Sequence, residues 1–302
     1  MSFRIACAMG LAFAMGVPAG PGMGPISVVS IGPAFAEDVA DGKRRVNLAG
    51  RQRMLTQRMT KATCFVALGV ERDHHRKMLQ TARDDFDRAL QALRFGDEGL
   101  GVYGEESAAR VLRGLGKVEK GWSDFDRNVS SALAKGEVGE DVEERLYSTN
   151  LPLLKDMNDT VSMIDQAHAD PNDMLLASAV AINIAGRQRM LTQKMAKELC
   201  QIQRGWRTEE TRKALETTMA LFEGSHAALR DGMPAAGVVP PPTEGIAASL
   251  KELEALWLTI RPTVAKAMNG DAIDDEELSV FAVSIDRLLR DMHAIVGLYE
   301  KA

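Results

Sequence analysis

The chain has 302 residues, of which 45% are hydrophobic, 26% charged and only 5% aromatic. This composition is that of a folded globular protein and excludes an intrinsically disordered chain. The 37 Lys and Arg residues against 42 Asp and Glu give a net charge of −5, whereas proteins that bind nucleic acid broadly carry a basic excess. We therefore expect no nucleic-acid partner. Few aromatic residues beside much Ala, Leu, Met and charge favour an all-helical protein.

Residues 1–36 have the pattern of a secretory signal peptide. Arg4 is the lone charge before an apolar stretch at residues 5–17, and residues 34–36 read Ala-Phe-Ala, which matches an A-x-A cleavage site. Pro18 interrupts the apolar stretch too early for a transmembrane helix. We expect an exported protein, periplasmic in a Gram-negative source, with an uncleaved membrane anchor as the alternative.

One segment of the mature sequence occurs twice. Residues 47–61, NLAGRQRMLTQRMTK, recur as residues 183–197, NIAGRQRMLTQKMAK, with 12 of the 15 positions identical. The correspondence continues beyond the motif, because Cys64 matches Cys200 at the same offset of 136. Self-similarity over this distance indicates a duplicated structural unit. The mature chain is therefore expected to be a tandem duplication with its boundary near residue 170.

Each unit is expected to contain four helices, because apolar residues recur at helical spacing and the alternation typical of strands is missing. The predicted helices span residues 40–69, 72–95, 105–135, 140–168, 172–205, 208–231, 244–269 and 274–300. Short loops favour antiparallel neighbours. The predicted fold is all-α, with two tandem up-down-up-down four-helix bundles, residues 37–170 and 171–302, after a signal peptide at residues 1–36.

On a helical wheel, each motif copy has an apolar stripe and a polar strip on the opposite side. The strip contains a glycine, an arginine and a glutamine in each copy: Gly50, Arg53 and Gln57, then Gly186, Arg189 and Gln193. Arginine offers a planar fork of donors that suits flat anions, and glycine allows close approach. A strip of this kind is more often a solvated face. However, both copies retain it while most of the sequence has diverged, so we expect either a ligand site or a shared packing role.

The repeated motif resembles the signature of the PilJ-type or NarX-like sensor domain, and the resemblance covers both units. Such domains form the periplasmic ligand-binding regions of nitrate- and nitrite-sensing histidine kinases and of some chemotaxis transducers. The resemblance implies a four-helix bundle, usually dimeric, that binds the anion at the dimer interface with one arginine from each subunit. The arginine before Met is the matching residue, which is Arg53 in the first unit and Arg189 in the second.

Such sensors normally lie between two membrane spans and drive an output module, and we expect neither feature after the second unit. We therefore expect an exported nitrate- or nitrite-type sensing or binding protein that hands its state to a membrane-bound histidine kinase or chemotaxis receptor. The alternative is an interaction module that binds no ligand and bridges membrane or pilus partners.

No arrangement of histidine with Ser, Cys or paired acids indicates catalysis, so we expect no enzyme and no cofactor. Asp73, His74 and His75 suggest metal ligands, but adjacent histidines diverge on a helix and the second unit has no counterpart. We therefore favour a polar helix start over a metal site.

The two units can meet in two ways. In a side-by-side arrangement, the motif helices run parallel, Arg53 faces Arg189, and the chain is an internal pseudo-dimer. In an end-to-end arrangement, a paired site requires a homodimer. Cys64 lies on the Arg53 side of its helix, about 16 Å further along, and Cys200 does likewise. A disulfide needs Cα atoms within about 7 Å, so we favour two buried thiols over a bond.

Overall fold

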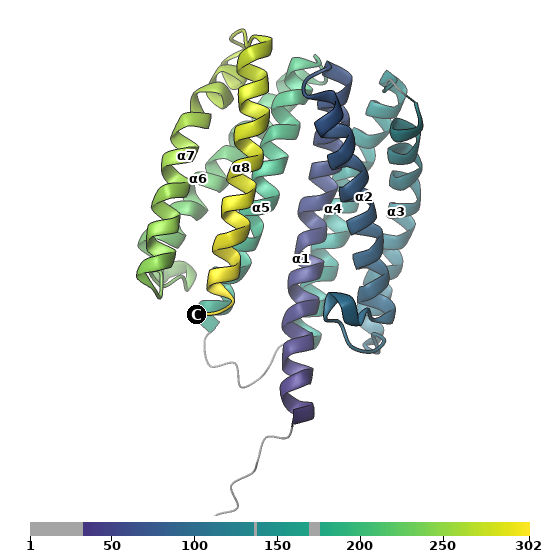
Figure 1. The fold of residues 1–302 in the computed structure, drawn as a ribbon, viewed down its shortest axis with the longest axis vertical. Coiled ribbons are helices and arrows are strands. Elements are labelled where there is room, and N and C mark those ends of the chain that lie inside the picture. The colour runs from purple at the N-terminus through teal and green to yellow at the C-terminus, as the bar shows by residue number, and fades with distance from the viewer. Residues whose placement is uncertain (1–32, 136–137, 169–175) are drawn as a thin grey trace, which may run out of the picture.

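The computed structural model describes residues 33–135, 138–168 and 176–302, and these residues form eight α-helices (Figure 1). The α-helices are α1 (Pro33–Leu68), α2 (Arg72–Phe95), α3 (Ala109–Ala134), α4 (Glu140–His168), α5 (Leu176–Gln203), α6 (Thr208–Asp231), α7 (Glu244–Asn269) and α8 (Asp275–Tyr299). The described residues contain no β-strand. The predicted all-α fold of two tandem helical bundles is confirmed, and α2, α4, α6 and α7 have the predicted bounds.

The observed starts of α1 and α3 differ from the predicted helix bounds. Helix α1 begins at Pro33, ahead of the expected end of the signal peptide at residue 36, because the alanines there continue a helix readily. Residues 1–32 and the expected unit boundary near residue 170 lie outside the described residues. Helix α3 begins at Ala109 rather than at residue 105, since a short 3₁₀ helix, Glu98–Leu100, and a bridge between Asp97 and Val102 precede it.

The same turn is built in both halves of the chain. A glycine follows the last residue of α2 and of α6. Gly96 and Gly232 each have φ of 82°, a positive value that glycine adopts without strain. A 3₁₀ helix follows in each case, and the second one spans Pro234–Ala236. The structure therefore repeats even where the residues of the two copies differ.

Aromatic side chains mark the centre of each bundle. The Trp122 ring lies 4.2 Å from that of Phe86, and the Trp257 ring lies 4.9 Å from that of Phe222. Each buried indole donates its N–H to an acidic side chain on the preceding helix, which satisfies the polar end of the ring. The two tryptophans occupy equivalent positions in the two halves because both pack in the centre of a bundle.

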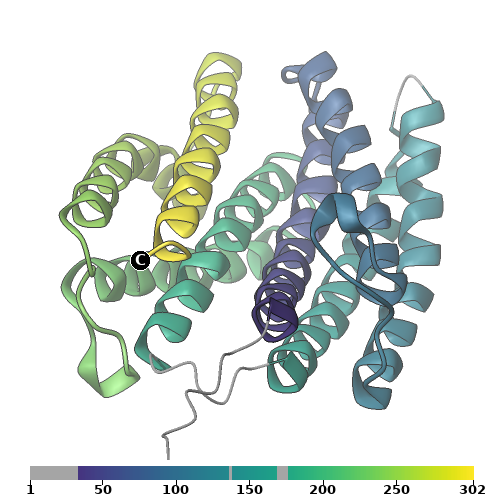
Figure 2. The same ribbon diagram turned by 60° about the horizontal axis from the view of Figure 1, so that its bottom comes forward.

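The two halves, α1–α4 and α5–α8, lie side by side, and α1 packs along α5 (Figures 1 and 2). Both helices start at the end of the molecule where α4 ends and α8 finishes (Figure 1). They therefore run parallel, and equivalent residues of the two motif copies meet. The end-to-end arrangement is wrong for this chain.

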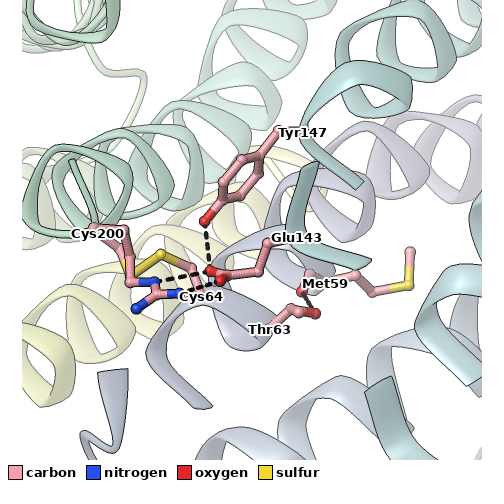
Figure 3. Close-up of a disulfide and its surroundings, with 7 residues drawn as sticks. Met59, Thr63, Cys64, Glu143, Tyr147 and Cys200 are labelled. Atoms are coloured by element: carbon pink, nitrogen blue, oxygen red, sulfur yellow. Dashed lines mark hydrogen bonds and ion pairs between the residues drawn. A yellow bond between two sulfur atoms is a disulfide. The ribbon is translucent and has the colours of Figure 1, made fainter. Parts of the chain in front are cut away.

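A disulfide joins α1 to α5 through Cys64 and Cys200, whose Cα atoms are 6.2 Å apart (Figure 3). The expectation of two free buried thiols is wrong, because the parallel helices approach closely at this point. The carboxylate of Glu143 lies beside the bond, where Tyr147 Oη and the Arg204 guanidinium donate to it at 3.0 and 2.6 Å. These contacts tie α4 of the first half to the turn that follows α5 of the second.

We predict that replacing both cysteines with alanine lowers the free energy of unfolding by about 3–5 kcal/mol, because the bond closes a loop of 136 residues. Urea unfolding of the variant and the wild type measures the difference. Peptide mapping without reductant should also recover a peptide that links Cys64 to Cys200. Recovery of both cysteines as free thiols would contradict the assignment.

Candidate functional site

The polar strips of the two motif copies face each other between α1 and α5 and are buried there. Only 6% of Arg53 and 3% of Arg189 is exposed, and Gln57 and Gln193 are fully buried. The interpretation of this strip as a solvated face is therefore wrong. The strip is instead the contact surface between the two halves.

At the arginine level, each guanidinium reaches across to the asparagine that opens the opposite motif. Arg53 Nη2 donates to Asn183 Oδ1 at 3.5 Å, and Arg189 Nη2 donates to Asn47 Oδ1 at 3.2 Å. The exchange is reciprocal, so the pair has the symmetry of a twofold dimer interface within one chain. We call these four residues the arginine layer.

The other nitrogen of each arginine is held by the last helix of its own half. Arg53 Nη1 donates to Asn158 Oδ1 on α4, and Arg189 Nη1 lies 3.1 Å from His293 Nδ1 on α8. A guanidinium can only donate, so His293 Nδ1 must accept and the ring is neutral. Burial, followed by the charges of Arg189 and Arg51, lowers the pKa of His293 and favours this state.

The arginine layer carries two positive charges with no carboxylate bound directly to either guanidinium among the described side chains. Burial, with the charges of Arg187 and Arg189, lowers the pKa of Arg53 to about 10. Burial also lowers the pKa of Arg189 to about 10, although Glu300 opposes the shift. Two desolvated cations side by side are costly unless a negative charge compensates them. This electrostatic imbalance favours an anion.

Gly50 and Gly186 lie next to the same guanidinium groups. A Cβ atom built on either glycine would stand 3.5 Å from Nη2 of the arginine three residues later. That nitrogen is the one that reaches across the interface. A methyl group at either position would touch this nitrogen in ordinary van der Waals contact, and glycine leaves that contact unmade.

The glutamines lie one helical turn beyond the arginine layer. Gln57 Nε2 donates to Thr56 Oγ1, and Gln193 Nε2 donates to Asp286 Oδ1 on α8. The carbonyl oxygens of both glutamines are buried without a hydrogen-bond partner in the described structure. The glutamines thus form a separate polar level, and their role in ligand binding remains a proposal.

A buried lysine follows in each copy, and each one reaches into the opposite half. Lys61 Nζ donates to Asp286 Oδ1 of α8 at 2.6 Å, whereas Lys197 Nζ donates to Asn150 Oδ1 of α4 at 3.1 Å. Only Lys61 has a carboxylate partner at its ammonium. Burial is the largest cause of a lowered pKa for Lys197, to about 8, with Glu198 opposing and Lys194 adding to it.

The sequence pattern located the arginines but not their partners. Asn47 and Asn183 were visible as identities at the first motif position, although no role followed from the wheel alone. Asn158 and His293 occupy matching places on α4 and α8 at the offset of 135, but they differ in residue type. The repeat register is the one signal that relates them.

The eight helices and the paired layer between equivalent helices define a tandem helical-bundle protein. The family described as type IV pili methyl-accepting chemotaxis transducer N-term (PilJ) matches residues 41–143 and 172–280, and so covers one motif copy in each half. The chain belongs to this family, whose members serve in sensing and signalling. No curated protein matches the chain. Within the described residues, every helix is too short or too polar to cross a membrane.

We predict opposite effects for the two buried lysines. Lys197→Met removes a desolvated ammonium and should raise the free energy of unfolding at pH 7 by about 1–2 kcal/mol. Lys61→Met leaves the Asp286 carboxylate buried without its partner and should lower it by about 3–5 kcal/mol. Urea unfolding of both variants measures the two effects, and equal losses in both would contradict the asymmetry.

The lowered pKa of Lys197 predicts that the free energy of unfolding depends on pH. Between pH 8 and 10.5, the unfolded chain binds a proton at Lys197 that the native chain does not, so wild-type stability gains from rising pH there. The stability difference between Lys197→Met and the wild type should therefore shrink from pH 7 to pH 10. A difference that stays constant over this range would show that Lys197 is charged in the native protein throughout.

Proposed function

We propose that this chain is an exported sensing or binding protein for a small oxyanion of the nitrate or nitrite type, with the anion held between Arg53 and Arg189. The observation that carries the proposal is the arginine layer. It contains two buried guanidinium groups that face each other without a carboxylate at either one. Membership in a family of transducer N-terminal domains supports a sensory role.

The chemistry of the layer suits a flat monovalent anion. Each guanidinium is a planar fork of donors, and two forks on opposite sides match an acceptor with oxygens in one plane. The asparagines that now accept from the forks hold them in place at long distances of 3.2 and 3.5 Å. An anion that replaces these contacts offers shorter, charge-assisted hydrogen bonds and neutralises one of the two buried charges.

The location of the site supports signalling as well as binding. The two arginines belong to different halves, so the ligand would contact α1 and α5 together. A ligand can shift a conformational equilibrium only if it interacts differently with the two states. A change in how α1 packs on α5 is the difference that this site is placed to sense, and we propose that a membrane-bound histidine kinase or chemotaxis receptor detects it.

We predict that Arg53→Ala or Arg189→Ala weakens nitrate or nitrite binding at least tenfold, since a charge-assisted contact contributes about 1.5–3 kcal/mol. Arg→Lys should also weaken binding, because an ammonium lacks the planar fork. Calorimetric titration of each variant with both anions measures the effect.

Arg127→Ala is the matched control, since Arg127 is an exposed arginine on α3 whose side chain is 74% accessible. This variant should bind the anion as the wild type does. If the folded double variant Arg53→Ala, Arg189→Ala also retains wild-type binding, the site lies elsewhere. If the wild type binds neither anion, the interaction-module alternative gains support.

The proposed partner is testable in the native compartment. Cross-linking in intact cells, with and without nitrate, should recover a membrane protein in a ligand-dependent amount. The double arginine variant should abolish that dependence without removing the partner itself. Equal recovery in all conditions would leave a binding protein without a signalling role.

A further inference from the structure

A group of metal-ligating side chains lies at the interface of the two halves, where Asp286 also binds the buried lysine Lys61. His74 and His75 come from the first turn of α2, and Asp286 comes from α8 of the other half. One ligand atom from each residue lies within 4.8 Å of the other two. The expectation that the adjacent histidines diverge does not hold for their rings, whose centroids are 5.3 Å apart.

Three polar atoms of this group, two on His75 and one on Asp286, are buried without a hydrogen-bond partner. His75 is fully buried, and neither of its ring nitrogens has a partner among the described residues. Asp286 is 4% exposed, and its Oδ1 accepts from Lys61 and Gln193. Its Oδ2 lacks a hydrogen bond and lies 3.6 Å from His74 Nε2. Native proteins rarely leave buried polar atoms unsatisfied, so these atoms point to a missing ligand.

We propose that His74, His75 and Asp286 bind a divalent first-row transition metal ion of the Zn²⁺ type. Two imidazoles and one carboxylate are a common donor set for zinc, with a fourth position left for water. Bonds of 2.0–2.2 Å place tetrahedral ligands about 3.4 Å apart, so no pair needs to close by more than about 1.4 Å. His74 Nε2 already lies 3.6 Å from Asp286 Oδ2, and the His74 side chain is 54% accessible.

The charge states of the ligands suit a metal. Burial, followed by the charge of Lys61, lowers the pKa of His75 to about 3, so its ring is neutral and offers a lone pair. Burial raises the pKa of Asp286, but Lys61 and Arg58 are among the groups that together lower it below its ordinary value, so the carboxylate stays ionised. Lys61 occupies Oδ1 and leaves Oδ2 for the ion. The exposed side of His74 provides a path from solvent.

Such an ion would join the two halves at a second point. The disulfide links α1 to α5, whereas this site would link α2 of the first half to α8 of the second. The second half has Glu210 and Thr211 in place of the two histidines. The pseudo-twofold arrangement therefore offers one such site per chain.

The test is a Co²⁺ titration of the full, untagged chain, followed by its visible ligand-field absorption and by displacement with Zn²⁺. We expect one ion per chain and a band typical of a nitrogen- and oxygen-bound site. His74→Gln should weaken Co²⁺ and Zn²⁺ binding at least tenfold, and it should preserve the fold because His74 is exposed. His75→Gln and Asp286→Asn should weaken binding as well.

His226→Gln is the matched control. His226 is also a buried histidine with both ring nitrogens unpartnered, but it belongs to no group of potential ligands in the described structure. This variant should bind Co²⁺ as the wild type does. The proposal is overturned if the wild type gives no saturable band, or if His74→Gln retains the wild-type affinity. Circular dichroism confirms that each variant is folded.

Discussion

The parallel packing of α1 against α5 is the constraint on which the rest of the structure depends. Because the two helices carry the same motif and run in the same direction, equivalent levels of the two copies lie beside each other. Cysteine therefore meets cysteine, with Cα atoms 6.2 Å apart, and a covalent bond forms. By the same geometry, arginine approaches arginine, and lysine approaches the opposite half. Because both motif copies carry the same basic residues, like charges lie close together within a buried interface.

The lysine level and the arginine level differ in how these charges are compensated. At the lysine level the symmetry is broken, since Lys61 has the Asp286 carboxylate and Lys197 has only an amide. At the arginine level each cation faces a neutral asparagine of the opposite half, although Arg53 is also held by Asn158 and Arg189 by His293. Two buried cations without a directly bound carboxylate are the basis on which we propose an anion site. The duplication also places both arginines in one chain, so a paired site needs no subunit association.

Much of this arrangement followed from the sequence. The repeat offset predicted which residues correspond, and the helical wheel placed Cys64 and Arg53 on one side of α1. The disulfide was not favoured because the wheel gives direction but not distance, and only the packed helices show how closely they approach. The partners Asn158 and His293 come from the last helices, and Asp286 meets His74 and His75 from the other half. Contacts of this kind depend on tertiary packing, which periodicity does not report.

The central claim is that one chain builds one complete anion site from its two halves. The most direct measurement is the binding stoichiometry for nitrate or nitrite, determined by calorimetry on a sample whose mass in solution is known from light scattering. The account predicts one anion for each chain in a monomer. Two anions per chain, or one anion shared by two chains, would contradict it.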